Sequence, residues 1–198
     1  MVRRKAIENP SIPVSLLEKL AEDEDKTVRE AVARNVNTPS SALVKVAEDE
    51  SMDALSVRTE VARNQNTPAF LLEKLAGDHI LVGRVVASNK NTASSVLEKL
   101  AEDEDKPMRE AVARNPSTPA SALKILSGDE DKDVRHNVAW NTITPSSLLE
   151  ELAGDENYNV RERVARNPNT SIPVLDKLAE DIDTVVRNAV AQNSKTSK

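Results

Sequence analysis

Apolar residues recur along the chain at the spacing of an amphipathic helix. A column of leucines is preceded by one variable apolar residue and followed, three residues later, by a second column that is mostly leucine. This i, i+3, i+4 pattern places all three columns on one helical face. The columns are Leu17, Leu43, Leu72, Leu97, Leu123, Leu149 and Leu175; Leu20, Val46, Leu75, Leu100, Leu126, Leu152 and Leu178; and Leu16, Ala42, Leu71, Val96, Ala122, Leu148 and Val174. We expect a helix of about ten residues, called helix A, at each occurrence.

A second apolar pattern follows each helix A after a short acidic turn such as Glu22-Asp23-Glu24-Asp25. Two columns, mostly valine, lie four residues apart, and the residue after the second column is always alanine. The valine columns are Val28, Val57, Val82, Met108, Val134, Val160 and Val186, and Val32, Val61, Val86, Val112, Val138, Val164 and Val190. This spacing predicts a second helix, helix B, that is shorter than helix A. The repeated alanine indicates close approach of a neighbouring helix.

Polar residues mark the predicted ends of both helices. Thr-Pro pairs at 38–39, 67–68, 118–119 and 144–145 are typical of a helix start, with the threonine hydroxyl as N-cap and proline at the first helical position. The asparagine after each helix B is predicted to end that helix in the left-handed conformation, which Asn tolerates. No stretch shows the sustained alternation of a β-strand.

These signals form an internal repeat. Residues 17–35 and 97–115 differ only at Thr27/Pro107 and Val28/Met108, and an Asn recurs at 9, 35, 64, 89, 115, 141, 167 and 193. Seven two-helix repeats, mostly of 26 residues, therefore occupy residues 9–192. Residues 1–8 are either a half-repeat or an N-terminal cap, and residues 193–198 are either the start of a further repeat or a tail. Because one such unit cannot bury its apolar stripe alone, we expect a single all-α repeat domain over residues 1–198, an α-solenoid.

The repeated pattern N-x-N-T-P-x-x-L-L-x-x-L-A-x-D-x-D-x-x-V-R-x-x-V-A-R resembles the leucine-rich repeat variant family. Asn64-Gln65-Asn66-Thr67-Pro68 and residues 160–167, Val-Arg-Glu-Arg-Val-Ala-Arg-Asn, carry the resemblance most clearly. It implies a right-handed superhelix of paired short helices, one of which can be partly 3₁₀. The unit also resembles a shortened HEAT repeat, in which an Asp after helix A and an Arg in helix B form a ladder. The iron–sulfur segment of one architecture in the variant family cannot be carried over, because this chain has no Cys.

Composition excludes several functions. Only three of the 198 residues are aromatic, and the formal net charge is -6, which disfavours a nucleic-acid backbone as the main partner. The lack of cysteine removes disulfides, thiolate nucleophiles and thiolate metal sites. No window of about 18 apolar residues could span a membrane, and no signal peptide is recognised. We expect a cytoplasmic protein without a cofactor.

The titratable residues form columns rather than a catalytic group. Asp recurs at 23, 49, 78, 103, 129, 155 and 181, and Arg at 3, 29, 58, 109, 135, 161 and 187, with Gly83 as the exception. Seven copies of one Asp predict a structural ladder, in which each carboxylate accepts from backbone N–H groups or a neighbouring Arg. Residues 129–140 have D-x-D-x-D spacing but lack the glycine and final acidic residue of an EF-hand loop. His79 and His136 are expected to be surface or turn residues, and no enzyme motif is present.

The residues that depart from their columns are the candidate binding residues. Trp140 occupies a column otherwise filled by Arg34, Arg63, Ser88, Arg114, Arg166 and Gln192, and Phe70 occupies a column of serines and one proline. Both rings should be exposed, and exposed aromatics flanked by Arg are typical anchors of binding sites. The candidate protein-binding residues are Phe70, Arg114, Trp140, Tyr158 and Arg166. The alternative is local packing, with Trp140 beneath Arg114 or Arg166 as a cation–π pair. The irregular stretches Ser51-Met52-Asp53-Ala54-Leu55 and His79-Ile80-Leu81 are either binding features or repacking around changes in repeat length.

Three functions remain open from the sequence. The favoured hypothesis is a non-enzymatic scaffold that binds a protein or peptide along the concave face of the solenoid. The second is a structural segment of a larger multidomain protein without its own partner. The third is nucleic-acid binding through the Arg column of helix B.

Overall fold

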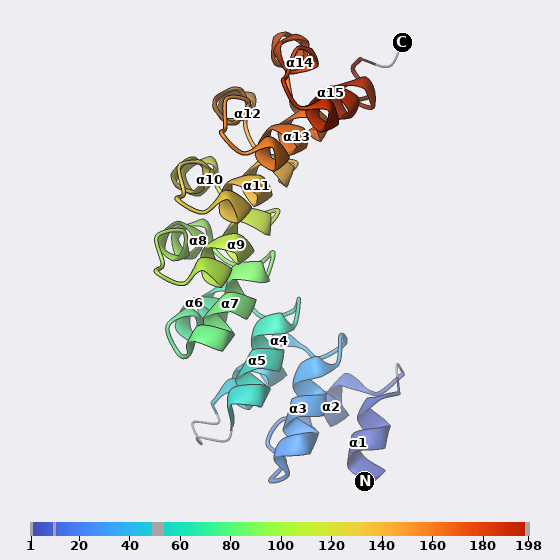
Figure 1. Ribbon diagram of the computed structural model, residues 1–198. Helices are drawn as coiled ribbons and strands as arrows, with labels where there is room; N and C mark the ends of the chain where they lie inside the picture. Colours follow the sequence, from blue (N-terminus) through green and yellow to red (C-terminus); the bar gives the residue numbers. More distant parts are fainter. Residues whose placement is uncertain (1, 10, 49–53, 197–198) are drawn as a thin grey trace. The chain divides into compact units, whose positions relative to one another are not determined.

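The computed structural model describes residues 2–9, 11–48 and 54–196, and within them the chain forms a series of short α-helices and no residue forms a strand (Figure 1). Asp49 of the Asp column and the irregular stretch Ser51-Met52-Asp53 lie outside the described residues. The A helices are α2 (Val14–Leu20), α4 (Ser40–Ala47), α6 (Ala69–Ala76), α8 (Ser94–Leu100), α10 (Ala120–Ser127), α12 (Ser146–Leu152) and α14 (Ile172–Ala179). The B helices are α1 (Val2–Ile7), α3 (Lys26–Arg34), α5 (Leu55–Arg63), α7 (Ile80–Ser88), α9 (Lys106–Arg114), α11 (Lys132–Trp140), α13 (Tyr158–Arg166) and α15 (Thr184–Ala191).

The relative lengths of the two helices differ from the sequence prediction. Helix A has seven or eight residues, whereas helix B has nine in most repeats, so helix B is the longer one. Helix A is short because the proline of the Thr-Pro pair is the N-cap: the Pro39 carbonyl accepts from Ala42 and Leu43, and the helix begins at Ser40. Helix B is long because it begins directly after the last residue of the acidic turn. The family resemblance implied that one helix of the pair can be partly 3₁₀, and among the described residues this conformation occurs at Ala54, directly before α5.

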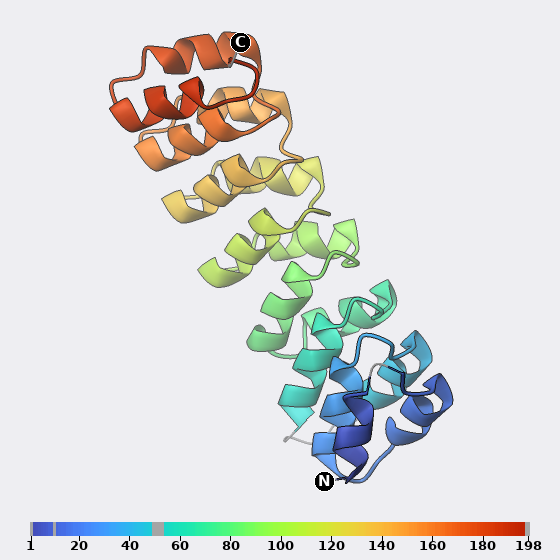
Figure 2. The ribbon, with the colours of Figure 1, turned by 90° about the vertical axis from the view of Figure 1, so that its right-hand side faces the viewer.

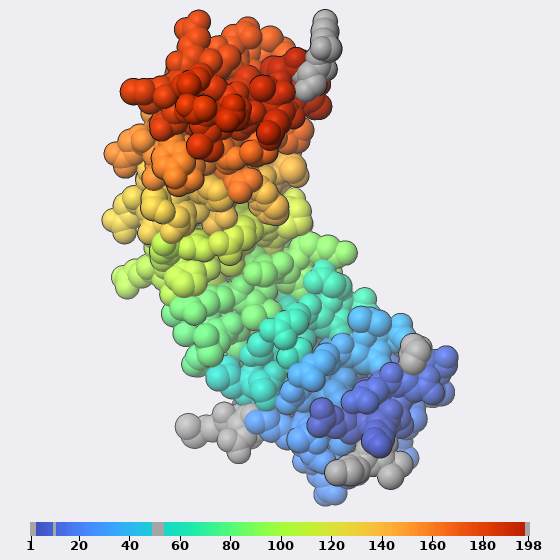
Figure 3. All heavy atoms as spheres, turned by 45° about the vertical axis from the view of Figure 1, so that its right-hand side comes forward, coloured from blue at the N-terminus to red at the C-terminus, as the bar shows by residue number. Residues whose placement is uncertain are grey.

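The chain divides into two compact units, residues 1–96 and 97–198, and the division falls within α8. In the second unit the B helices α9, α11, α13 and α15 pack against one another in order, and each A helix packs on the B helix that follows it (Figure 2). The first unit repeats this arrangement with α1, α3, α5 and α7. In the space-filling view the repeats of each unit form successive bands of colour (Figure 3). The prediction of a single domain over residues 1–198 stays a prediction.

The predicted apolar columns form the core of both units. Every leucine of the first helix A column is fully buried, and so are nearly all residues of the two helix B columns. The repeated alanine is fully buried in six repeats and exposed only at Ala191. Because each repeat is one helix pair thick, these small and branched side chains suffice to fill the interior, which accounts for the scarcity of aromatic residues.

The asparagine after each helix B joins consecutive repeats through its side chain. Asn141 Nδ2 donates to the carbonyls of Ala113 (2.8 Å) and Asn115 (3.0 Å) in the preceding repeat. Its Oδ1 accepts from the backbone N–H of Ile143. Equivalent bonds are made by Asn64, Asn89, Asn167 and Asn193. We call this series the asparagine ladder, and it fixes the register between neighbouring repeats.

The left-handed conformation predicted for these asparagines is wrong. The cap residues are extended, with φ between -66° and -80°, and no described residue, glycine included, has a positive φ. These caps are Asn35, Asn64, Asn89, Asn115, Asn141 and Asn167. The position requires asparagine because its side chain supplies two donors and one acceptor to backbone groups. The small alanine two residues earlier leaves room for the next repeat to reach its carbonyl.

The threonine of the Thr-Pro pair also has a different role from the one predicted. Thr144 Oγ1 donates to the Val138 carbonyl at 2.6 Å, and the threonines of the other repeats bond their own preceding helix B in the same way. The hydroxyl therefore caps the end of helix B instead of the start of helix A. Since the final carbonyls of a helix lack partners within the helix, this bond satisfies one of them in a buried position.

The N-terminal half-repeat makes the contacts of an ordinary helix B. The Ile7 carbonyl accepts from Asn35 Nδ2 at 2.6 Å, and Arg3 pairs with Asp23 at 2.9 Å. Residues 2–8 therefore extend the asparagine ladder, and the Arg–Asp ladder predicted from the sequence, by one step. Whether they cap the array or continue an earlier repeat stays a prediction.

Candidate functional site

Arginine and aspartate form the predicted ladder at the opposite end of helix B. In the second unit three arginines pair with the Asp that lies 20 residues later, in the next repeat: Arg109 Nε lies 2.6 Å from Asp129 Oδ2, and Arg135 and Arg161 repeat this geometry with Asp155 and Asp181. Each pair is bidentate, because Nη2 donates to the second carboxylate oxygen. The carboxylates are almost fully buried except that of Asp78. The ladder is therefore confirmed, with its ion pairs running between repeats.

The same arginines also close the acidic turn of their own repeat. Arg109 Nη1 donates to the carbonyls of Asp103 and Glu104, and Arg135 and Arg161 do the same in their repeats. The ladder aspartate accepts the backbone N–H two residues later, as Asp129 does from Asp131. The hydrogen bond to the next repeat's aspartate raises the pKa of Arg109, Arg135 and Arg161 above the ordinary arginine value.

Asp103 shows what the exception at Gly83 removes. By the 20-residue spacing its partner would be residue 83, and Asp103 has no arginine partner among the described residues. Its carboxylate still accepts the Asp105 N–H at 2.8 Å. The carboxylate thus keeps its role in the turn.

The ladder leaves neither its arginines nor its aspartates available for other chemistry. The paired guanidinium groups are mostly buried and bonded on both sides. Binding of a phosphate backbone through this column would require breaking these pairs, so the geometry disfavours the nucleic-acid hypothesis. Across the described part of the chain, no three His, Asp or Glu side chains are grouped to hold a metal ion.

A second row of residues lies at the other end of helix B, one position before each ladder asparagine. We call it the outer row. It comprises Arg34, Arg63 and Ser88 in the first unit, and Arg114, Trp140, Arg166 and Gln192 in the second, and all of them are exposed.

The asparagine ladder places Trp140 between Arg114 and Arg166 in the outer row. Asn141, directly after Trp140, bonds the carbonyls on either side of Arg114. Asn167, directly after Arg166, bonds the carbonyls on either side of Trp140. Three of the five candidate residues are thus brought together on adjacent helices α9, α11 and α13.

The exposure predicted for Trp140 and Phe70 is confirmed, and the Tyr158 ring is also exposed. Trp140 is 54% exposed, Phe70 63% and Tyr158 43%. Phe70 lies on α6 of the first unit, and Tyr158 begins α13, at the end of helix B away from the outer row. Neither therefore joins Trp140 in one site, and their roles in binding stay predictions.

The two arginines beside Trp140 are held by neighbours other than its ring. Arg114 pairs with Glu110 on its own helix at 2.5 Å, and its Nε donates to Asn137 Oδ1. Arg166 pairs with Glu162 and donates from Nη1 to Gln192. These bonds hold both guanidinium groups to groups other than the indole, which favours an open Trp140 over the cation–π alternative.

Sequence reasoning missed the apolar residues of the loops that follow helix B. Ile143 is exposed three residues after Trp140, and Pro116 and Pro168 are exposed in the neighbouring repeats. Their columns are otherwise mostly polar, so the same comparison of columns that singled out Trp140 could have found Ile143.

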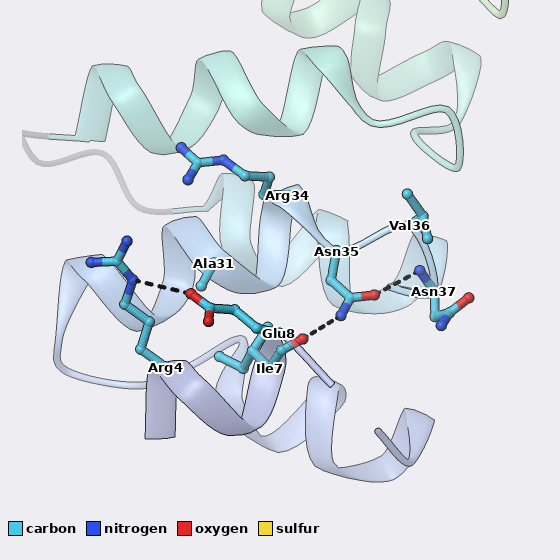
Figure 4. Close-up of a pocket in the computed structure, with 8 residues that line it drawn as sticks. All are labelled: Arg4, Ile7, Glu8, Ala31, Arg34, Asn35, Val36 and Asn37. Carbon is cyan, nitrogen blue, oxygen red and sulfur yellow. Dashed lines mark hydrogen bonds and ion pairs between the residues drawn. The ribbon is translucent and has the colours of Figure 1, made fainter. Parts of the chain in front are cut away.

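The first unit has hollows along its part of the outer row. One of about 300 Å³ is lined by Arg4, Ile7, Glu8 and residues of α3 and the loop after it, and a second of about 240 Å³ adjoins Arg34 and Arg63 (Figure 4). Arg4 pairs with Glu8 across the first hollow, and Val36 is highly exposed beside it. No tryptophan lies in this part of the row.

The two histidines occupy different settings. His79 is exposed in a turn and its Nδ1 accepts from Leu81 N, so it replaces the acidic residue as the N-cap of α7. This favours repacking over binding for the stretch at residues 79–81. His136 lies within α11 and its Nε2 accepts from Arg163 Nε at 2.9 Å. Burial, followed by the charge of Arg163, lowers the pKa of His136.

These features define an α-helical repeat scaffold, in which side-chain ladders join the repeats and the outer row carries the variable residues. A sequence model of the leucine-rich repeat variant family matches residues 108–131. A solved leucine-rich repeat variant, described as having a novel repetitive structural motif, is 28% identical with a TM-score of 0.62, over 96% of this chain and 80% of that chain. The predicted resemblance to this family and the α-solenoid fold class are therefore confirmed.

Two further solved structures are more distant. An engineered protein is 17% identical, covering 96% of this chain and 72% of its own, with a TM-score of 0.41. A computationally designed armadillo repeat protein for modular peptide recognition is 18% identical, covering 96% and 89%, with a TM-score of 0.22. Both superpositions are too loose to carry an argument. The search of curated proteins finds no match. None of the helices in the described ranges is long and apolar enough to cross a bilayer.

Proposed function

We propose that the protein is a non-enzymatic cytoplasmic scaffold that binds a protein or peptide through the outer row of its second unit. The observation that carries the proposal is the exposed Trp140 between two arginines on adjacent helices. Tryptophan and arginine are the residue types most enriched among those that dominate binding energy at interfaces.

The stability of the fold does not explain why residue 140 is a tryptophan. Five of the other six repeats place Arg or Gln there, and the Trp140 side chain is 54% exposed. An exposed indole leaves a large apolar surface in water, which a partner would cover. The polar groups of the two ladders, by contrast, are bonded to other groups of the protein. The outer row is therefore the part of helix B where the residue type can vary between repeats.

Selection from a phage-displayed peptide library tests the proposal. We expect the wild-type protein to enrich peptides that bind it in solution, and Trp140→Ala to weaken their binding by about tenfold or more, the effect of losing a tryptophan anchor. Circular dichroism would verify that the variant keeps its helices.

Ile125→Ala provides the matched control, because Ile125 is an exposed apolar residue on α10 of the same unit, outside the outer row. It should leave binding unchanged. Equal binding by wild type and Trp140→Ala would show that the row is not the binding surface.

A further inference from the structure

The outermost charge of the outer row is positive on both sides of Trp140. Arg114 is 52% exposed whereas its partner Glu110 is 18% exposed, and Arg166 and Glu162 show 43% and 13%. The glutamates therefore lie beneath the guanidinium groups and hold them in place. Arg114 Nη1 and Arg166 Nη2 have no partner among the described residues, so each arginine presents donors to an approaching ligand.

The centre of this surface is apolar. Trp140 ends α11, and Ile143 lies three residues later in the loop of the same repeat, and both are exposed. A ligand that covers them must carry an apolar side chain, and groups placed one repeat to either side of that side chain meet Arg114 and Arg166.

The distance between repeats sets the spacing of the ligand groups. Packed helices lie about 8–10 Å apart, and an extended chain rises about 3.3 Å per residue. One repeat therefore corresponds to about three residues of an extended peptide. Guanidinium groups bind carboxylates in a planar, bidentate manner.

We infer that this surface binds an extended peptide segment in which an apolar residue is flanked, three residues away on each side, by an acidic residue. The inference rests on the proposed function and adds the chemistry of the partner. The net charge of -6 repels long runs of negative charge, so two separated carboxylates that meet the two arginines fit better than a polyanion.

Trp140 is the only tryptophan in the chain, so its fluorescence reports directly on this surface. The probe is the capped peptide Glu-Ser-Ser-Leu-Ser-Ser-Glu, titrated into the full chain. Comparison peptides carry Gln or Lys in place of both Glu residues, or both Glu residues together at one end. We expect a saturable change in Trp140 emission with the first peptide, and affinities lower by about tenfold or more for the others.

Variants test the role of each arginine. Arg114→Gln and Arg166→Gln should each weaken binding of the acidic peptide and leave the affinity for its Gln counterpart unchanged. Arg34→Gln, at the equivalent position of the first unit, is the matched control and should change neither affinity.

The outcomes separate the inference from the proposed function. Equal or tighter binding of the Gln or Lys peptide, or of the peptide with adjacent Glu residues, would overturn the inference and leave peptide binding intact. If no probe peptide changes the emission and library selection enriches only peptides without the acidic flanks, the inference is again wrong. If library selection also yields no peptide that depends on Trp140, the proposed function fails as well.

Discussion

Asparagine, threonine and arginine side chains make hydrogen bonds in each repeat to backbone groups that have no partner within a helix. They satisfy the backbone carbonyls left without partners where helix B and the acidic turn end. The hydrogen bonds of the asparagine and the threonine are buried, so removing one leaves an acceptor without water to replace the donor. The sequence identified these columns, but not their partners. The periodicity within one repeat does not say how two repeats are aligned with each other. The 20-residue offset of the Arg–Asp pairs could therefore not be derived from the sequence.

Replacing a ladder asparagine should be costly. Asn141→Ala removes two donors and one acceptor and leaves buried backbone groups unsatisfied, so we expect a loss of about 2–4 kcal/mol in the free energy of unfolding. Urea unfolding measures it. Asn159→Ala, at an exposed position on α13, should cost much less, and equal losses would contradict the role of the ladder.

The arginine–aspartate ladder should make stability depend on acid pH. Arg161, and then the Asp183 N–H, lower the pKa of Asp181 below its ordinary value of 3.8. The carboxylate is therefore favoured in the folded state, so its stabilising contribution is present above that value and is lost as the pH falls through the lowered pKa.

Asp181→Asn tests this sign. The variant should be less stable than wild type near neutral pH, and the difference should shrink at acid pH, as the pH falls below 3.8 and the wild-type carboxylate takes up a proton. Urea unfolding at the two pH values gives the comparison. A difference that is independent of pH would mean that the ion pair contributes no net stability.

The helices themselves followed from the sequence more closely than their ends did. Apolar spacing placed every described helix and its buried face, because that periodicity reflects the packing of one repeat on the next. Helix ends depend on single hydrogen bonds, and Thr144 has two possible uses for its hydroxyl, capping the helix before it or the helix after it. In the structure the Thr144 hydroxyl caps the preceding helix, α11. The exposure of Trp140 was predictable for the same reason as the helices, since the other members of its column are polar.

The end of α11 should depend on the Thr144 hydroxyl. Thr144→Val keeps the shape of the side chain and removes the donor to the Val138 carbonyl, so we expect a loss of about 1–3 kcal/mol. Thr142→Val, two residues earlier and exposed, is the matched control. Thermal and urea unfolding of both variants would measure the loss. Equal stabilities of the two variants would mean that the Thr144 hydroxyl contributes nothing to the free energy of unfolding.

At the scale of the molecule, each compact unit is a linear series in which a repeat contacts mainly its neighbours. In such a series the loss of an interior residue weakens the packing toward two neighbours, whereas a loss in the last repeat weakens one. The apolar columns predicted this stacking. They could not predict a division near residue 96, because Leu97 and its column continue the pattern without a break.

Two leucines of the second unit test the linear arrangement. Leu123 on α10 and Leu175 on α14 occupy the same column and are both fully buried. Each substitution by alanine should cost about 2–5 kcal/mol, with Leu123→Ala the more damaging because a repeat lies on each side of it in this unit. Thermal melts of the two variants give the ranking, and a reversed order would count against nearest-neighbour coupling.

The asparagine ladder has a consequence for how such a chain can change over generations. Its bonds to the preceding asparagine are kept at separations of 25, 26 and 29 residues, because the differences in length fall in the turn between helices A and B. A gene segment copied or lost between two of these asparagines would still give every side-chain donor an acceptor in its new neighbour. Unequal recombination between near-identical stretches, such as those encoding residues 17–35 and 97–115, could therefore alter the number of repeats without a compensating mutation. The order of outer-row residues, and with it the choice of partner, would be reshuffled in the same event.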